Sequence, residues 1–336
     1  MRTFFSAALI AAFFGLIVAS CSKGSSNPTT NPVDSSTVCN ASFYAYSARC
    51  LDTGYGPYTR WQYGSFNLTG ATINMQDSLK MPGYNNQGTY NSHTYCYYVF
   101  TDSVGIPVLL KIDNSGVVTR KPLATFTQAR FEALVYNSYS NKMYAVKKGI
   151  TFTDTFVVIN EGTSDFTTTN IVQTPLGATR LASSTVNQVD GTLFLAMNYT
   201  SPTGYKLFTY TPGTTVLNQI ASGNNQFLLG IRHNKQDKQL YGIQQTLATN
   251  GSYLVKMNAT TGAQADADTL GFDIDRDRYS ACLDVCDNKF IISTTKMVGG
   301  LWDTAQTAVY QVNATTAGGM QYTDKTGIIM GLEVRY

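Results

Sequence analysis

The chain carries little charge and almost no histidine. Charged residues are 13% of its 336 residues, against about a quarter in an average soluble chain, and only 2 residues are histidine. No Lys/Arg cluster suggests a nucleic-acid-binding or membrane-binding stripe. The spacing of the 6 cysteines matches no zinc signature. The composition therefore argues against a nucleic-acid-binding protein and against a Cys/His zinc module.

Familiar catalytic motifs are also missing. The sequence has no G-x-S-x-G elbow, no H-E-x-x-H pair and no P-loop. His93 and His233 each lie in or beside a polar turn, so each is either a general base or a solvated turn residue. A Ser-His-Asp triad stays open, because its members meet only in space. After the N-terminal segment no window shows a helical period, which leaves strands as the expected structure.

One motif recurs about every 48 residues, the period of a supersecondary repeat. Each copy is an apolar strand followed by Asn, Asp or Thr and then by a turn that usually contains Gly. The copies are Phe66–Gly70, Leu110–Gly116, Val158–Gly162, Phe208–Gly213, Lys256–Gly262 and Gln311–Gly318. A second element, a polar turn before an apolar strand, repeats upstream with an aromatic residue at Tyr97, Tyr144, Phe194, Tyr241 and Phe290.

These units predict an all-β fold, a six-bladed β-propeller with four-stranded antiparallel blades. A solenoid is the competing architecture. The first unit, near residues 40–80, lacks an innermost strand. The last residues, Ile328–Tyr336, resemble the innermost strand of the other units. We therefore expect this C-terminal strand to close the first blade and to remove two free sheet edges.

The N-terminal residues predict that the protein is exported to the cell envelope. Residues 1–20 read as a signal peptide with an apolar stretch too short for a comfortable membrane span. The sequence Val18-Ala19-Ser20-Cys21 resembles the lipobox of bacterial lipoproteins, which implies lipidation of Cys21. An ordinary secretory peptide with a chance Cys is the alternative. Residues 21–38 would then be the lipidated Cys and a flexible tether, and residues 39–336 the propeller.

With the lipobox and the repeats together, the chain resembles the broad class of bacterial lipoprotein β-propellers. The resemblance implies a monomer held to the membrane of the bacterial cell envelope by its lipid anchor. In a Gram-negative cell this would be the outer membrane, facing the periplasm or the exterior. Related propellers include binding scaffolds, lyases and quinoprotein dehydrogenases, so the fold alone does not decide the function. Nothing in this chain maps onto a quinone or metal site of those enzymes.

Five cysteines follow Cys21, an odd number that leaves at least one thiol unpaired. If Cys39 and Cys50 flank one extended strand, they lie too far apart to pair with each other. Cys282 and Cys286 face the same objection. We expect Cys96 and Cys282 to be buried free thiols that act as small hydrophobes.

Two groups of charged residues are candidate sites. Arg130, Arg180 and Arg278 each precede an innermost strand, so they either hold an anionic group at the channel rim or brace adjacent blades. Asp273, Asp275 and Asp277 alternate in the densest charge cluster. They are either weak ligands for calcium, partners of neighbouring arginines in salt bridges, or catalytic carboxylates. No other cofactor is predicted.

Two long loops between second and third strands are expected to meet after ring closure. They are Arg49–Tyr58 and Lys296–Thr304, which carry Tyr55, Tyr58 and Trp302. These aromatics either bind a ligand or pack their own loops shut. The sequence thus favours a binding or scaffold protein for a glycan, a peptide or an envelope protein. The alternative is a glycan-active hydrolase or lyase with its site at the channel mouth, marked by paired carboxylates.

Overall fold

All strands of the computed structural model belong to the unit Ser35–Tyr336. The described residues are 42–49, 60–67, 72–80, 87–103, 105–149, 153–174, 179–201, 203–247, 251–326 and 328–335. In these ranges the chain forms strands and turns, and no helix is long and apolar enough to cross a membrane. The signal peptide, Cys21 and the tether lie outside the described residues.

The strands form six four-stranded antiparallel sheets. Five sheets use four consecutive strands each. The first two contain β4 (Thr89–Asn91), β5 (Cys96–Ser103), β6 (Ile106–Ile112) and β7 (Val118–Pro122), then β8 (Arg130–Asn137), β9 (Lys142–Lys148), β10 (Thr155–Glu161) and β11 (Phe166–Gln173). The third contains β12 (Thr179–Val186), β13 (Leu193–Thr200), β14 (Thr203–Tyr210) and β15 (Asn218–Asn224).

The next two consecutive sheets follow the same pattern. They contain β16 (Gln226–Asn234), β17 (Gln239–Thr246), β18 (Ser252–Asn258) and β19 (Gln264–Thr269), then β20 (Tyr279–Asp284), β21 (Lys289–Val298), β22 (Leu301–Asn313) and β23 (Gln321–Thr326). The remaining sheet has the order β24-β1-β2-β3 and joins the two ends of the chain. Its strands are β24 (Ile328–Arg335), β1 (Ser42–Arg49), β2 (Arg60–Asn67) and β3 (Thr72–Lys80).

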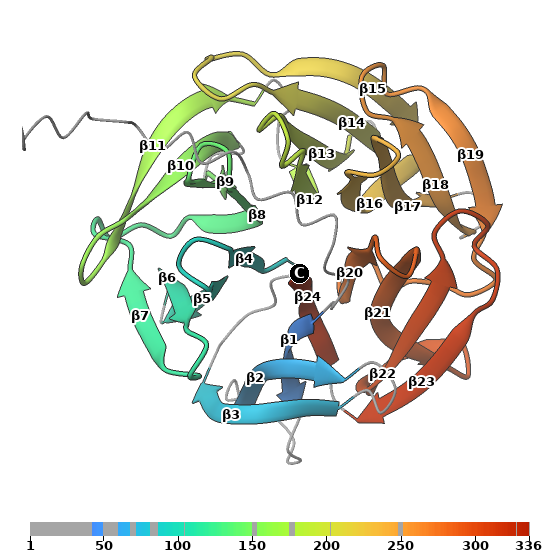
Figure 1. Ribbon diagram of the computed structural model, residues 1–336, viewed down its shortest axis with the longest axis horizontal. Helices are drawn as coiled ribbons and strands as arrows, with labels where there is room; N and C mark the ends of the chain where they lie inside the picture. The colour runs from blue at the N-terminus through green and yellow to red at the C-terminus, as the bar shows by residue number, and fades with distance from the viewer. Residues whose placement is uncertain are drawn as a thin grey trace, which may run out of the picture. The chain divides into compact units, whose positions relative to one another are not determined.

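The innermost strands lie side by side around a common axis (Figure 1). Contacts join β4 to β8, β8 to β12, β12 to β16, β16 to β20, β20 to β24, and β24 back to β4. Neighbouring innermost strands run in the same direction. On β16 the backbone N–H groups of Ile231 and His233 donate to Ser183 Oγ and Thr185 Oγ1 of β12, so the residue numbers increase together along the two strands. The predicted all-β propeller with four-stranded antiparallel blades is confirmed.

The pairing expected for the C-terminal strand is observed. β24 pairs with β1 so that Val334 lies opposite Phe43 and Ile329 opposite Ser47. β24 also contacts β20 of the preceding blade, where the backbone N–H of Leu332 donates to Ser280 Oγ at 2.8 Å. The strand therefore hydrogen-bonds on two sides, within its own sheet and toward the neighbouring blade.

The recurrent Asn and Asp residues are explained by their turns. Asn91, Asn137, Asn234 and Asp284 end the innermost strands, and the Oδ1 of each accepts one or two backbone N–H groups from the turn that follows. Asn258 and Asn313 do the same after third strands. A short side chain that hydrogen-bonds its own backbone two residues on favours a tight turn. The turn Gly262, at φ +68°, takes a conformation that suits glycine.

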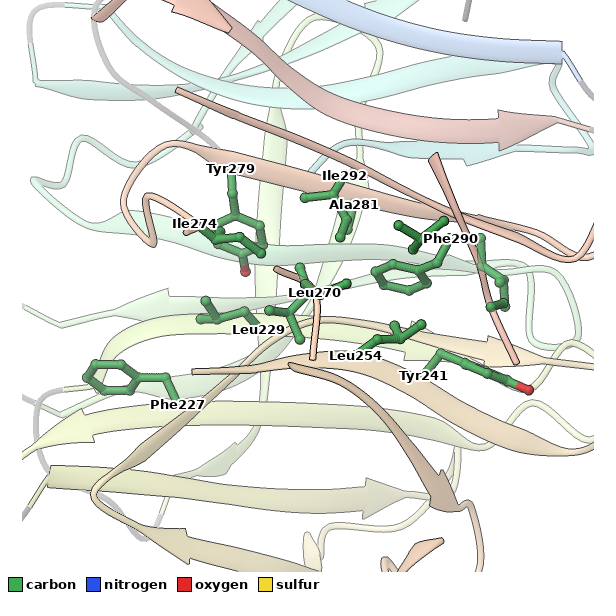
Figure 2. Packing of buried hydrophobic residues seen from close by; sticks show 14 of the residues in the cluster. Phe227, Leu229, Tyr241, Leu254, Leu270, Ile274, Tyr279, Ala281, Phe290 and Ile292 are labelled. Carbon is green, nitrogen blue, oxygen red and sulfur yellow. The ribbon is translucent and has the colours of Figure 1, made fainter. Parts of the chain in front are cut away.

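The core consists of apolar layers between neighbouring blades. Figure 2 shows one of them, between the β16–β19 and β20–β23 sheets, where Tyr241 and Leu254 meet Phe290 and Ile292. The repeated aromatics Tyr97, Tyr144, Phe194, Tyr241 and Phe290 are all buried. Each blade thus buries apolar surface only by stacking on its neighbours, which makes the ring cooperative.

The prediction for two cysteines is confirmed, because Cys96 and Cys282 are buried free thiols. Burial raises the pKa of the Cys282 thiol and keeps it neutral. Cys286 is disulfide-bonded, and its partner is not Cys282. The objection to a Cys282–Cys286 bridge therefore holds.

Candidate binding face

The ends at which the innermost strands begin define one face of the propeller, named here the hairpin face. The connections between second and third strands open on this face too. Arg130, the first residue of β8, pairs with Lys148 at the end of β9. In the β20–β23 sheet the backbone N–H of Thr295 donates to the carbonyl of Arg278, just before β20. Arg130, Arg278 and the predicted loop at Lys296–Thr304 therefore share a face.

The loop predicted at Lys296–Thr304 is instead a β-hairpin. β21 continues to Val298, β22 begins at Leu301, and the turn is only Gly299-Gly300. Both glycines have positive φ, +60° and +82°, which two-residue hairpin turns require. The prediction of a loop was wrong because Met297 and Val298 face Trp302 and Leu301 in a regular ladder.

This hairpin projects beyond the rest of its sheet. The β20 ladder begins at Tyr279↔Thr294, and the β23 ladder ends at Gln306↔Thr326. Beyond these ladders, β21 and β22 continue as a two-stranded ladder in which Met297 pairs with Trp302 and Val298 with Leu301, and no third strand of the described residues pairs with these four. At the tip, Met297, Val298 and Leu301 are 40%, 51% and 76% exposed, which gives the ribbon an apolar end in water.

The aspartate segment packs against the base of this hairpin. Asp275 is buried, and its Oδ2 accepts from Thr295 Oγ1 at 2.6 Å while its Oδ1 accepts from the N–H of Asp277 at 3.1 Å. Arg278 Nη1 lies 3.6 Å from Asp275 Oδ2. Asp273 and Asp277 are exposed. Both Asp275 oxygens thus already have protein donors, as expected from the salt-bridge reading of this segment.

Among the residues that the structure describes, no group of three or more His, Cys, Asp or Glu side chains is arranged to hold a metal ion. Arg276 also has a protein partner, because its guanidinium lies over the Phe227 ring at 5.2 Å in a cation–π contact. The aspartate segment that leads into β20 is therefore fixed by the contacts of Asp275 and Arg276.

The three predicted arginines begin three different blades. Arg130 is exposed at the first position of β8, whereas Arg278 is engaged by Asp275. Arg180 is the second residue of β12. Of Trp302 only the backbone pairing is described, and Tyr55 and Tyr58 lie outside the described residues. A shared ligand site for these side chains stays a prediction.

Below the hairpin face, two pairs of polar side chains connect strands that are not neighbours. Gln87 precedes β4, donates to the carbonyl of Ser184 at 2.7 Å and accepts from its N–H at 3.1 Å; Ser184 lies on β12, two blades away. Arg232 on β16 lies 3.9 Å from Glu333 on β24, past β20. Both contacts therefore reach past an intervening blade.

Two carboxylates near the axis have perturbed acidity. Burial raises the pKa of Glu333 to about 7 although Arg232 opposes the shift. Burial also raises the pKa of Glu132, which accepts from the N–H of Ala182 at 3.0 Å and lies 3.3 Å from Lys148 Nζ. The Glu333 and Glu132 side chains keep 25% and 23% of their surface exposed, so neither is sealed inside an apolar layer.

The sequence motifs did not point to Gln87, Glu132, Arg232 or Glu333. The available signal was a charged residue inside an apolar innermost strand, as Arg232 follows Phe227–Ile231 and Glu333 follows Ile328–Leu332. Such a residue is costly in a core unless a partner or water compensates it. The strand pattern alone gave no indication of which strands would supply the partners.

The two histidines differ from each other. His93 is exposed, and its Nδ1 lies 2.5 Å from Tyr136 Oη, which donates to Asn141 Oδ1 at 2.9 Å. His233 is not a solvated turn residue: its ring stacks on Phe194 at 5.6 Å, and burial lowers its pKa to about 4. His233 is therefore neutral at pH 7, and the reading of it as a solvated residue was wrong.

Neither a family model nor a curated protein matches this chain. Solved propellers do match it in fold. TolB from Acinetobacter baumannii aligns with a TM-score of 0.61 at 10% identity, over 87% of this chain and 66% of that one. The chain thus spans about two thirds of the TolB chain.

Two further structures show the same likeness. One chain of a nidogen/laminin complex aligns with a TM-score of 0.59 at 11% identity, over 87% of this chain and 98% of that one. A periplasmic gluconolactonase from Pseudomonas aeruginosa aligns with a TM-score of 0.55 at 8% identity, over 88% and 99%. At these identities the matches support the propeller fold and leave the activity open.

Proposed function

We propose that this protein is a cell-envelope lipoprotein whose propeller is a scaffold that binds a partner protein through its hairpin face. Cys21 carries the lipid anchor to the membrane, residues 22–38 are the tether, and the six sheets form a ring closed by β24. The observation that carries the proposal is the projecting β21–β22 hairpin with an apolar tip. Exposed apolar groups gathered on a rigid projection mark interaction sites more often than scattered ones do.

A protein suits this tip better than a glycan does. Met297, Val298 and Leu301 are aliphatic, and aliphatic side chains complement an apolar protein surface, whereas sugars stack on flat aromatic faces. The hairpin also offers backbone groups, because its outer residues pair with no third strand in the described part of the chain. An extended segment of a partner can pair with such an edge. A glycan or a free peptide remains an alternative ligand for the same face.

Site-specific photo-crosslinking tests this proposal. A photoreactive residue at Leu301 should capture one protein in intact cells, and the same residue at Val216 should not. Val216 is a matched control because it is 53% exposed and lies in the turn before β15, on another part of the propeller. Equal capture at both positions, or capture at neither, would contradict a partner-binding hairpin.

Trp302→Ala gives a second test on the captured partner. If Trp302 contributes to binding, its loss should weaken the affinity about tenfold and leave the melting temperature nearly unchanged. A large loss of stability with unchanged affinity would make Trp302 a packing residue.

The second candidate is a glycan-active hydrolase or lyase, favoured by the raised pKa values of Glu132 and Glu333 near the axis. Against it, Lys148 and Arg232 pair with these carboxylates, as in a structural network. Turnover of a glycan or sugar-lactone panel that is lost in both Glu132→Gln and Glu333→Gln would favour the enzyme. No turnover by the wild-type protein would favour the scaffold.

A further inference from the structure

The face opposite the hairpin face, named here the turn face, is formed by the turns at which the innermost strands end. Exposed apolar residues gather on three neighbouring turns of this face, residues 92–95, 138–141 and 188–191, which follow β4, β8 and β12 (Figure 1). Tyr95, Tyr139 and Val189 are 54%, 61% and 63% exposed, and His93 in the first turn is exposed too. We propose that this surface is a second binding site, which takes a neutral glycan chain through Tyr139, Tyr95 and His93.

Hydrogen bonds join the three turns into one surface. The Tyr136 hydroxyl, at the end of β8, lies 2.5 Å from His93 Nδ1 in the first turn and donates to Asn141 Oδ1 in the second at 2.9 Å. The backbone N–H of Ser138 in the second turn donates to Gln188 Oε1 in the third at 3.1 Å. A surface that is already ordered loses little conformational freedom when a ligand binds.

Tyr139 forms a flat platform on this surface. Its ring lies against Gly191 of the third turn so closely that a Cβ at this glycine would be 2.8 Å from Tyr139 Cδ1. The neighbouring turn therefore supports the ring from one side, while more than half of the residue remains in water. A supported and exposed aromatic ring suits a ligand that stacks on it.

Tyr95 has an unusual backbone conformation for its size. Its φ is +54°, in the left-handed region that bulky residues rarely adopt. The corresponding positions of the next two turns hold Asn141 and Gly191, the residue types that tolerate this region best. An exposed aromatic residue kept where Asn or Gly would be less strained is explained by a use of its ring, because such strain gathers at functional sites.

His93 supplies a hydrogen-bonding group in the first of the three turns. Because Tyr136 Oη donates its own proton to Asn141, it accepts from the imidazole Nδ1–H of His93. In the neutral ring the other nitrogen, Nε2, then carries the lone pair and accepts hydrogen bonds. An exposed imidazole acceptor with a fixed tautomer suits the hydroxyl group of a sugar.

The charge pattern of the turn face indicates a neutral ligand. Residues 92–95 and 138–141 contain no Asp, Glu, Lys or Arg, whereas the turn after β16 holds Lys235, Asp237 and Lys238. In the third turn Asp190 is engaged, since its Oδ1 accepts from the N–H of Thr192 at 2.8 Å. A polyhydroxylated ligand can stack on the tyrosines and donate to His93 without any charge losing its hydration. The aliphatic tip of the β21–β22 hairpin offers no such combination.

Affinity electrophoresis of the full-length protein in mild detergent tests the proposal. The probes are soluble neutral polysaccharides, namely dextran, laminarin, xyloglucan and galactomannan, each in a separate native gel. We expect at least one of them to retard the wild-type protein. Tyr139→Ala should weaken this binding by about threefold to tenfold, the range for one aromatic contact, and Tyr139→Phe, which keeps the ring, should bind like the wild type. No retardation in any gel would overturn the proposal.

Tyr95→Asn separates recognition from packing. It should weaken binding while raising the melting temperature by up to about 3 °C, because Asn relieves the backbone strain. A lower melting temperature with unchanged binding would overturn the place of Tyr95 in the site. Binding should also be the same at about 0.05 and 0.5 M NaCl, since the site uses no ion pair, and binding that disappears with salt would overturn neutral recognition.

Phe126→Ala is the matched control on the other face. Phe126 is 66% exposed and lies in the connection between β7 and β8, at the hairpin face, so its loss should leave glycan binding unchanged. Leu301→Ala should leave it unchanged as well, which keeps this test separate from that of the hairpin. Equal losses in Phe126→Ala and Tyr139→Ala would overturn the proposal. Capture of one protein by a photoreactive residue at position 139 would assign the turn face to a protein instead.

Discussion

The closing strand should be a main source of stability, and Leu332→Ala tests this. Leu332 is fully buried and packs with Cys282, Ile291, Val309 and Ile329. Its neighbours lie on paired strands of two blades and cannot collapse far into the space that the side chain leaves. Leu→Ala substitutions at such sites cost about 3–5 kcal/mol. This cost is a large share of a typical stability of 5–15 kcal/mol. In a domain of this size it lowers the melting temperature by about 10 °C.

Urea unfolding followed by tryptophan fluorescence measures the change. Leu301→Ala is the matched control, because it removes the same atoms from a side chain that is 76% exposed; it should cost less than about 0.5 kcal/mol. If Leu332→Ala unfolded within about 1 kcal/mol of the wild type, β24 would not be packed as described, and the closure of the ring through it would be refuted.

Four further results are expected. Burial sets the pKa of Glu333 to about 7 in the folded protein against 4.5 in the unfolded one, so the free energy of unfolding should fall as pH rises from about 4.5 to 7, and Glu333→Gln should flatten that slope in urea titrations. The imidazole of His233, with its pKa lowered to about 4, should stay neutral down to about that pH in an NMR titration; a midpoint near 6.5 would contradict its burial. Asn137→Ala should cost about 2–3 kcal/mol in chemical denaturation, because the side chain is fully buried, donates to Gly191 O at 2.7 Å and accepts from two turn N–H groups. Cys21→Ala should move the protein out of the membrane fraction or stall its processing, and unchanged fractionation would remove the anchor from the proposal.

The blade repeat was predictable because one physical rule generates it. A strand must end in a tight turn before the next strand of the same blade, and a short amide or carboxylate side chain stabilises that turn through its own backbone. Asn91, Asn137, Asn234 and Asp284 do this in four of the five blades that are built from consecutive strands, and Asn258 and Asn313 repeat it after third strands. The sequence period is the period of these turns.

The contacts near the axis could not be predicted for an equally physical reason. Gln87 reaches Ser184, and Arg232 reaches Glu333, across an intervening blade. Which side chains meet near the axis depends on the diameter of the ring and on which residue of each strand faces inward. Neither property is encoded in a local sequence pattern. The register shift between Leu229 and Arg232 also turns the end of β16 relative to its start.

The hairpin shows the opposite failure, because a local signal was present in the sequence and was not used. Gly299-Gly300 is a strong turn signal for a two-residue hairpin, yet the segment Lys296–Thr304 was predicted as a loop. Strand pairing needs only local partners, so the hairpin forms although no third strand supports its outer half. A long hairpin with an apolar tip and no supporting strand lowers the solubility of the protein and adds little to the stability of its own blade.

The two faces of the propeller therefore carry different constraints. The turns after innermost and third strands are tight and fixed by side chains such as Asn137, whose substitution would disturb two blades at once because it also bonds Gly191 in the next turn. The hairpin face has connections of unequal length, and a change at Leu301 leaves every blade intact. A surface that can vary without unfolding the ring is where a specific partner can be accommodated. The β21–β22 hairpin, which Asp275 and Thr295 brace at its base, is the described part of that surface best positioned to recognise one.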